Sequence, residues 1–245
     1  PYTISDCNHC GLCVEPCPEL ALTLEPGPLV VVDRDRCTSC DVCIEVCPFD
    51  STPLAYEASV DELIDQIRET AKFISGITVS GGEATEQIDF LVDLFTAVKS
   101  DPALTKLTTF VDTNGSAPRR VWDRLAPVMD GAMVDLKAID EKTHIQLTAA
   151  SNVEVLASIE YLASIDRLYE VRLLIMPGYN DDPDTVERTT QWLRTVDPNM
   201  RIVVIGFRSH GLRPGFEYLT EASPEATEAI GEQVRSAGFS DVLVV

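Results

Sequence analysis

Eight cysteines within the first fifty residues constrain this chain of 245 residues more than any other feature. They form two runs with the spacing C-x2-C-x2-C-x3-C, each followed directly by proline. The first run holds Cys7, Cys10, Cys13 and Cys17, and the second holds Cys37, Cys40, Cys43 and Cys47. No cysteine follows Cys47, so the chemistry of thiols is confined to one short segment.

This spacing is that of the bacterial two-cluster ferredoxins. Three thiolates two residues apart can hold three corners of one [4Fe–4S] cubane, while the fourth thiolate of each run reaches the other cluster. The pattern therefore assigns Cys7, Cys10, Cys13 and Cys47 to one cluster, and Cys37, Cys40, Cys43 and Cys17 to the second. Two alternatives exist. A disulfide framework would need an oxidising compartment, and a zinc ribbon would use C-x2-C knuckles rather than four-cysteine runs.

Beyond residue 55 apolar strands alternate with amphipathic helices. We expect a ferredoxin-like domain over 1–55, with a strand at Leu29–Val32, and a second domain over 56–245. Expected strands are Phe73–Val79, Leu107–Val111, Ala132–Leu136, Val171–Met176, Ile202–Phe207 and Val242–Val245. Expected helices are Val60–Ala71, Ile88–Lys99, Arg119–Val128, Val153–Ala163, Thr185–Thr195 and Pro224–Ser236. Buried strands joined by helical crossovers predict an α/β fold whose parallel strands curl into a full or partial (β/α) barrel.

Polar residues follow five of the expected strands. They are Ser80-Gly81-Gly82-Glu83, Asp112-Thr113-Asn114-Gly115, Asp135-Leu136-Lys137, Met176-Pro177-Gly178-Tyr179 and Arg208-Ser209-His210-Gly211. Each could be only a turn or a surface segment. Because the carboxyl ends of parallel strands share one edge of a sheet, the five together predict a site there.

Two further residues, Arg172 and His144, are polar residues within expected secondary structure. Arg172 interrupts an apolar strand, where an unpaired cation would be costly, so an anionic ligand or a carboxylate must meet it. Asp135 is the internal candidate for that partner. His144 lies on a polar helix start, and we interpret it as structural.

In this order, the motifs resemble the radical S-adenosylmethionine (SAM) enzymes that activate glycyl radical enzymes, the pyruvate formate-lyase activating enzyme-like family. The motifs are Ser80-Gly81-Gly82-Glu83, Val111-Asp112-Thr113-Asn114-Gly115, Asp135-Leu136-Lys137 and Arg172-x4-Pro177-Gly178. Several members carry a two-cluster ferredoxin insert, which the segment Cys7–Cys47 resembles in kind and place. The resemblance implies a partial radical SAM barrel that reductively cleaves SAM to a 5′-deoxyadenosyl radical and installs a glycyl radical on a partner enzyme.

The resemblance also implies roles for single residues. The backbone of Gly81 and Gly82 and the carboxylate of Glu83 would hold the methionyl ammonium. Asp135, Leu136 and Lys137 would contact the ribose or carboxylate, Arg172 would pair with the carboxylate, and His210 would line the adenosine pocket. The family's monovalent-cation site corresponds to Asp112, Thr113, Met133 and Asp135.

One departure from the family is serious. The C-x3-C-x2-C loop that holds the family's radical cluster, a third [4Fe–4S] cluster, is not in this sequence, and all eight cysteines belong to the ferredoxin motifs. We expect that the first strand and its loop precede Pro1, and that the chain alone is inactive. A competing hypothesis is an iron–sulfur electron-transfer protein with a partner-docking barrel and no SAM chemistry. A third is a SAM-independent barrel enzyme that uses the clusters as a redox conduit.

The net charge of −21 argues against nucleic acid or an anionic membrane as partner. No apolar run approaches the roughly 20 residues that span a bilayer, and there is no signal-peptide pattern. We therefore expect a cytoplasmic protein, and the family resemblance implies a role in anaerobic metabolism. Its expected partners are a glycyl radical enzyme and an electron donor such as flavodoxin or ferredoxin.

Overall fold

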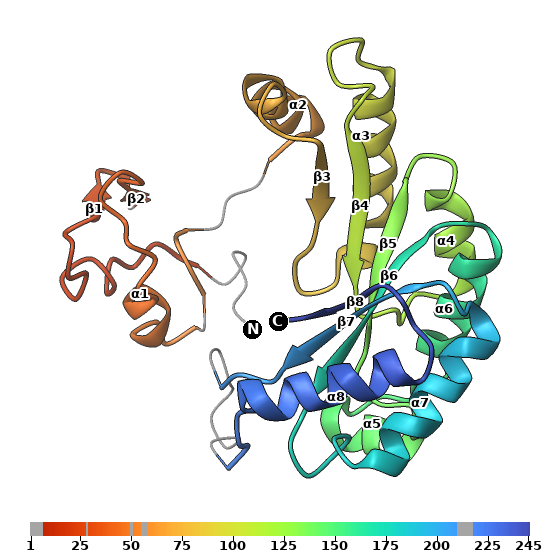
Figure 1. Ribbon diagram of the computed structural model, residues 1–245. Helices are drawn as coiled ribbons and strands as arrows, with labels where there is room; N and C mark the ends of the chain where they lie inside the picture. Colours follow the sequence, from red (N-terminus) through yellow and green to blue (C-terminus); the bar gives the residue numbers. More distant parts are fainter. Residues whose placement is uncertain (1–6, 28, 50, 55–57, 210–217) are drawn as a thin grey trace. The chain divides into compact units, whose positions relative to one another are not determined.

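The chain forms two compact units, Pro1–Ser59 and Val60–Val245, which are described separately. The computed structural model describes residues 7–27, 29–49, 51–54, 58–209 and 218–245 (Figure 1). Within these residues, no helix is both long and apolar enough to cross a membrane.

The first unit is a small hairpin with a single helical turn. Strands β1 (Leu22–Glu25) and β2 (Leu29–Val32) pair antiparallel, and α1 (Val42–Glu45) precedes the last cysteine. Leu22 and Val30 of the hairpin and Cys43 of α1 form a small buried core. The strand expected at Leu29–Val32 is confirmed, and its partner β1 is an additional finding.

The second unit begins with α2 (Val60–Thr70) and contains six parallel strands. The strands are β3 (Gly76–Val79), β4 (Thr108–Thr113), β5 (Gly131–Leu136), β6 (Leu168–Ile175), β7 (Arg201–Gly206) and β8 (Val242–Val244). They lie side by side in the order of the sequence. Because crossovers between parallel strands are right-handed, a sheet that always advances in one direction places its helices on one face. The expected parallel sheet is confirmed, and β3 and β8 are its two edges, as in a partial barrel.

The connecting helices cover the outer face of this sheet (Figure 1). They are η2 (Ala84–Gln87), α3 (Ile88–Ser100), α4 (Arg119–Leu125), α5 (Glu141–Thr148), α6 (Val153–Ser164), α7 (Pro183–Val196) and α8 (Pro224–Ser236). Side chains alternate along each strand, so in β4 Thr109, Val111 and Thr113 are buried toward the helices while Asp112 lies on the other face. The main core, which includes Phe95, Trp122 and Ile159, forms where the helices meet the sheet.

Several boundaries differ from the sequence prediction by one to three residues, and two of these differences are informative. The first strand of the sheet begins at Gly76 rather than Phe73, and the Phe73 side chain is 87% exposed. Strand β6 begins at Leu168, three residues before the expected start, and therefore contains the buried Glu170. A buried carboxylate breaks an apolar pattern, and for this reason the hydrophobic pattern alone missed the start of the strand.

Gly115 and Gly178 form a matched pair for testing how tightly the strand ends are packed. Both have positive φ values, +74° and +80°. A Cβ at Gly115 would lie 2.8 Å from Val134 and 3.1 Å from Val155, whereas a Cβ at Gly178 would meet nothing within 4 Å. We expect Gly178→Ala to cost about 1 kcal/mol for the left-handed backbone, and Gly115→Ala to cost a further 1–3 kcal/mol or so for overpacking. Urea unfolding of both variants measures the difference, and equal costs would contradict the packing argument.

Candidate functional site

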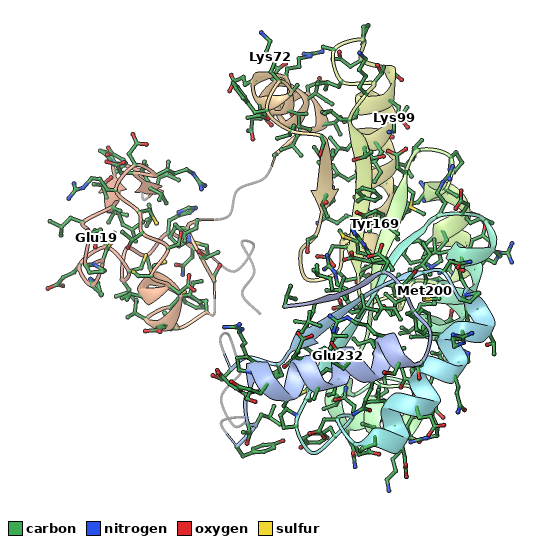
Figure 2. All side chains as sticks on the ribbon, in the orientation of Figure 1. Glu19, Lys72, Lys99, Tyr169, Met200 and Glu232 are labelled. Carbon is green, nitrogen blue, oxygen red and sulfur yellow. The ribbon has the colours of Figure 1, made fainter. Side chains whose placement is uncertain are left out.

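The carboxyl ends of the strands surround a hollow of about 540 Å³ in the second unit. We call it the strand-end hollow; its lining includes Gly81, Gly82 and Glu83 after β3, Asp112 to Asn114 at β4, Asp135 and Lys137 at β5, Arg172 of β6 and Ile205 of β7. Tyr169 and Met200, labelled in Figure 2, lie near the amino-terminal starts of β6 and β7, which are the ends of these strands away from the hollow. The parallel strands thus bring together residues that are more than one hundred positions apart in the sequence.

The carboxylate of Glu83 joins the end of β3 to the end of β4. Its Oε1 accepts hydrogen bonds from the backbone N–H of Thr85 at 3.1 Å and from the hydroxyls of Thr85 and Thr113, both at 2.7 Å. Its Oε2 accepts from the backbone N–H of Asn114 at 2.8 Å. A carboxylate oxygen has about two lone-pair sites, so Oε2 keeps acceptor capacity for a ligand. Next to it, a Cβ at Gly81 or Gly82 would meet nothing within 4 Å, so the backbone there is open to a ligand.

Arg172 is held by two carboxylates on the inner face of the sheet. Its Nε donates to Glu170 at 2.7 Å, and its Nη1 lies 3.0 Å from Asp112. Burial disfavours the charged guanidinium, but the bonds to Glu170 and Asp112 outweigh it, and the pKa of Arg172 is raised. The expectation that Asp135 is the internal partner is wrong, because Asp135 instead pairs with Lys137 at 2.9 Å.

The residues expected at a monovalent-cation site, Asp112, Thr113, Met133 and Asp135, do not surround an open space for a cation. Nη2 of Arg172 lies 2.9 Å from the sulfur of Met133, so the guanidinium fills the space between Met133 and Asp112. The hydroxyl of Thr113, which is almost fully buried, donates to Glu83. Among the described residues of the strand-end hollow, no three His, Asp or Glu side chains are grouped so as to hold a single metal ion.

Of the other residues considered in the sequence analysis, some line the strand-end hollow and some do not. Lys137 lines the strand-end hollow beside Asp135, whereas the Leu136 side chain is buried in the main core. His210 lies outside the described residues. His144, which we interpreted as structural, lines the same hollow from α5. Sequence reasoning missed it because the helix that carries it is short and weakly amphipathic.

A buried hydrogen-bond chain supports the β4 side of the hollow. The Trp122 indole Nε1 donates to the hydroxyl of Ser158 at 2.8 Å, and that hydroxyl donates to the carbonyl of Gly115 at 2.8 Å. Trp122 is fully buried. The turn after β4 is therefore anchored to the core at Gly115, next to the residues that face the hollow.

The cysteines of the first unit surround two small hollows. One is lined by Cys17, Cys37, Cys40 and Cys43, and the other by Cys7, Cys10, Cys13 and Cys47 with a contribution from Cys43. All eight thiols are free, and burial raises the pKa of Cys13 and Cys43. Each hollow thus gathers three cysteines of one run and the fourth of the other. This donor set fits a thiolate-held cluster, which would keep the buried sulfurs deprotonated.

The parallel sheet and the polar hollow at its strand ends define the class of this protein. The chain belongs to the radical SAM superfamily, which residues 35–193 match, and residues 6–51 match the 4Fe-4S dicluster domain.

Its relatives include activating enzymes. Pyruvate formate-lyase 1-activating enzyme of Escherichia coli is 31% identical over 161 residues, 63% of this chain and 64% of the relative. Choline trimethylamine-lyase activating enzyme of Oleidesulfovibrio alaskensis is 28% identical over 249 residues, 96% of this chain and 79% of the relative. The chain thus spans less than two thirds of the length of the first of these proteins.

Among solved structures, a domain of pyruvate-formate lyase-activating enzyme from Bacteroides vulgatus superposes with a TM-score of 0.59. The sequences are 20% identical, and the match covers 70% of this chain and 99% of that domain. At this identity the likeness shows the fold alone.

Proposed function

We propose that this chain is the SAM-binding and ferredoxin-type part of a glycyl radical enzyme activating enzyme. The observation that carries the proposal is the strand-end hollow, where Glu83 offers a fixed carboxylate and Arg172 a fixed guanidinium. A ligand with an ammonium, a carboxylate and a nucleoside matches that combination of charges. The names of the relatives support the reaction class.

The proposed reaction is the one-electron cleavage of SAM. The C5′–S bond breaks to give methionine and a 5′-deoxyadenosyl radical, which takes a hydrogen atom from a glycine Cα of the partner enzyme and becomes 5′-deoxyadenosine. When bound, a reduced [4Fe–4S] cluster would supply the electron. This sequence contains no C-x3-C-x2-C loop for a third, radical-generating cluster, so the role proposed for its own residues is to bind and orient SAM.

Six residues of the hollow have a proposed task in binding. The Glu83 carboxylate and the open backbone at Gly81 and Gly82 hold the methionyl ammonium. Arg172 and Lys137 meet the methionyl carboxylate, and Asp135 meets a ribose hydroxyl. We propose no monovalent cation, because the Arg172 guanidinium already lies against Asp112 and Met133.

The first unit has a proposed electron-carrying role. Its two cysteine hollows would hold two [4Fe–4S] clusters with the crossed ligand sets, and a donor such as flavodoxin or ferredoxin would reduce them. Eight free thiols also suit the reducing cytoplasm, which we propose as the compartment.

Binding measurements test the proposal. We expect the anaerobically reconstituted chain to hold about eight iron atoms, four per cubane, and to bind SAM in equilibrium dialysis. An iron–sulfur electron-transfer protein would hold the same iron but bind no SAM. Full iron content without SAM binding would therefore overturn the proposal and favour that alternative.

Paired cysteine variants test the crossed ligand sets. Cys17→Ala with Cys37→Ala removes two ligands of one crossed set, so we expect about four iron atoms to remain. Cys13→Ala with Cys17→Ala removes one ligand from each set, and both clusters should be weakened. Iron analysis and electron paramagnetic resonance distinguish the two variants. If each run held its own cluster, the two results would be exchanged.

A further inference from the structure

His144 lies in the wall of the strand-end hollow with one ring nitrogen committed to the protein. Its side chain belongs to α5 and is only 4% exposed. Its Nδ1 lies 2.8 Å from the carbonyl oxygen of Ala150 and 3.1 Å from the hydroxyl of Thr148. A carbonyl oxygen can only accept, so Nδ1 carries the proton in this contact. In the neutral imidazole, Nε2 is then left as a hydrogen-bond acceptor.

The other ring nitrogen, Nε2, has no hydrogen bond to the part of the chain that the structure describes. Among the same residues, no fully buried side-chain nitrogen or oxygen lacks a hydrogen-bond partner. Nε2 is therefore accessible, although the residue as a whole is buried. Because His144 lines the strand-end hollow, that hollow is where Nε2 is reached.

The charged groups of the hollow differ in chemistry from Nε2 of His144, which is an uncharged acceptor. Arg172 and Lys137, which pair internally with Asp112 and Asp135, are the cations that the proposed function assigns to the methionyl carboxylate. Glu83 is the carboxylate available to an ammonium. An uncharged acceptor in the same hollow is suited to a neutral donor, such as a hydroxyl or an aromatic amine.

We infer that His144 is a ligand-binding residue, whose Nε2 accepts a hydrogen bond from a hydroxyl or amino group of the nucleoside part of the ligand. The inference rests on the proposed function, in which that ligand is SAM. Neutral donors on such a nucleoside are the two ribose hydroxyls and the adenine amine. The Nδ1 bond to Ala150 fixes both the ring orientation and the tautomer, so that Nε2 faces the hollow ready to accept.

Two conservative substitutions separate ligand binding by Nε2 of His144 from the structural contact between Nδ1 and Ala150. His144→Asn keeps an N–H near the position of Nδ1 and removes the acceptor, whereas His144→Gln keeps a polar group near the position of Nε2 and removes the anchor. Gln146→Ala is the control, because Gln146 is exposed on the same helix and does not line the hollow. SAM and free methionine are titrated into each reconstituted protein.

We expect His144→Asn to weaken SAM binding about five- to tenfold, the equivalent of one hydrogen bond, and to leave methionine binding unchanged. His144→Gln should stay within about threefold of the unmodified chain for SAM, and Gln146→Ala should equal it. Unchanged SAM binding in His144→Asn would overturn the inference, as would an equal loss for SAM and methionine, which would mean a structural role. If the unmodified chain binds no SAM, the proposed function itself fails, and the inference fails with it.

Discussion

Arg172→Ala is expected to reduce SAM affinity at least a hundredfold and to lower the free energy of unfolding by about 3 kcal/mol. The affinity falls because the fixed cation of the strand-end hollow is lost. The stability falls because Glu170 is only 7% exposed and would keep a buried charge without its partner. Equilibrium dialysis and urea unfolding of the same protein measure the two effects.

A second variant separates these two effects. Replacing Glu170 with Gln and Arg172 with Met together removes both buried charges, so most of the lost stability should return while SAM binding stays absent. Arg235→Ala is the surface control: Arg235 also contacts two carboxylates, Glu228 and Glu232, but on α8, where its side chain is 35% exposed against 22% for Arg172. An exposed pair contributes at most about 1 kcal/mol. The proposed role of Arg172 is wrong if the double variant regains SAM affinity.

Glu83→Ala is expected to weaken SAM binding by roughly a hundredfold, because a charge-assisted hydrogen bond contributes about 1.5–3 kcal/mol and the neighbouring strand ends lose their link. Without the carboxylate, the hydroxyl of Thr113 and the backbone N–H of Asn114 have no acceptor there. We expect the rest of the sheet to stay folded, since the core lies on its other face.

Glu83→Gln shows which part of this effect comes from charge. The amide keeps an acceptor oxygen for Thr113, but its NH2 group then faces the backbone N–H of Asn114, and it cannot neutralise an ammonium. We therefore expect a loss of stability smaller than that of Glu83→Ala and a SAM affinity that is still reduced about tenfold. Glu86→Ala, an exposed change in η2, is the matched control. Equal SAM affinity for Glu83→Gln and the unmodified chain would mean that Glu83 supports the loop and does not meet the ammonium.

The sequence predicted most of the fold because its signals are local. Alternating apolar segments predicted the parallel sheet. Three of the five expected strand-end segments, those at Ser80–Glu83, Asp112–Gly115 and Asp135–Lys137, contribute residues to the lining of the strand-end hollow, whereas Met176–Tyr179, Arg208 and Ser209 are not among its described lining residues. The prediction failed where the local pattern was weak. The helix Glu141–Thr148 is short and polar on most sides, and β6 starts with residues whose burial does not alternate.

Side-chain pairing across the sheet could not be predicted in the same way. Asp135 and Arg172 lie opposite each other in the β5–β6 register, yet Arg172 reaches across Met133 to Asp112 on β4. Strands β5 and β6 also shift register between Ala132 and Met133, which no sequence pattern signals. The choice of partner depends on these distances in space.

The sequence by itself determined two features. The spacing of the cysteines predicted a unit with two four-cysteine groups, and the alternation of strands and helices predicted a parallel sheet with its carboxyl ends at one edge. Both follow from spacing along the chain, which the covalent backbone sets. Only the tertiary structure decided that Glu170 and Asp112 hold Arg172, and that His144 lines the strand-end hollow. Those contacts join residues that meet only when parallel strands and their crossover helices pack, so their geometry is a property of the folded sheet.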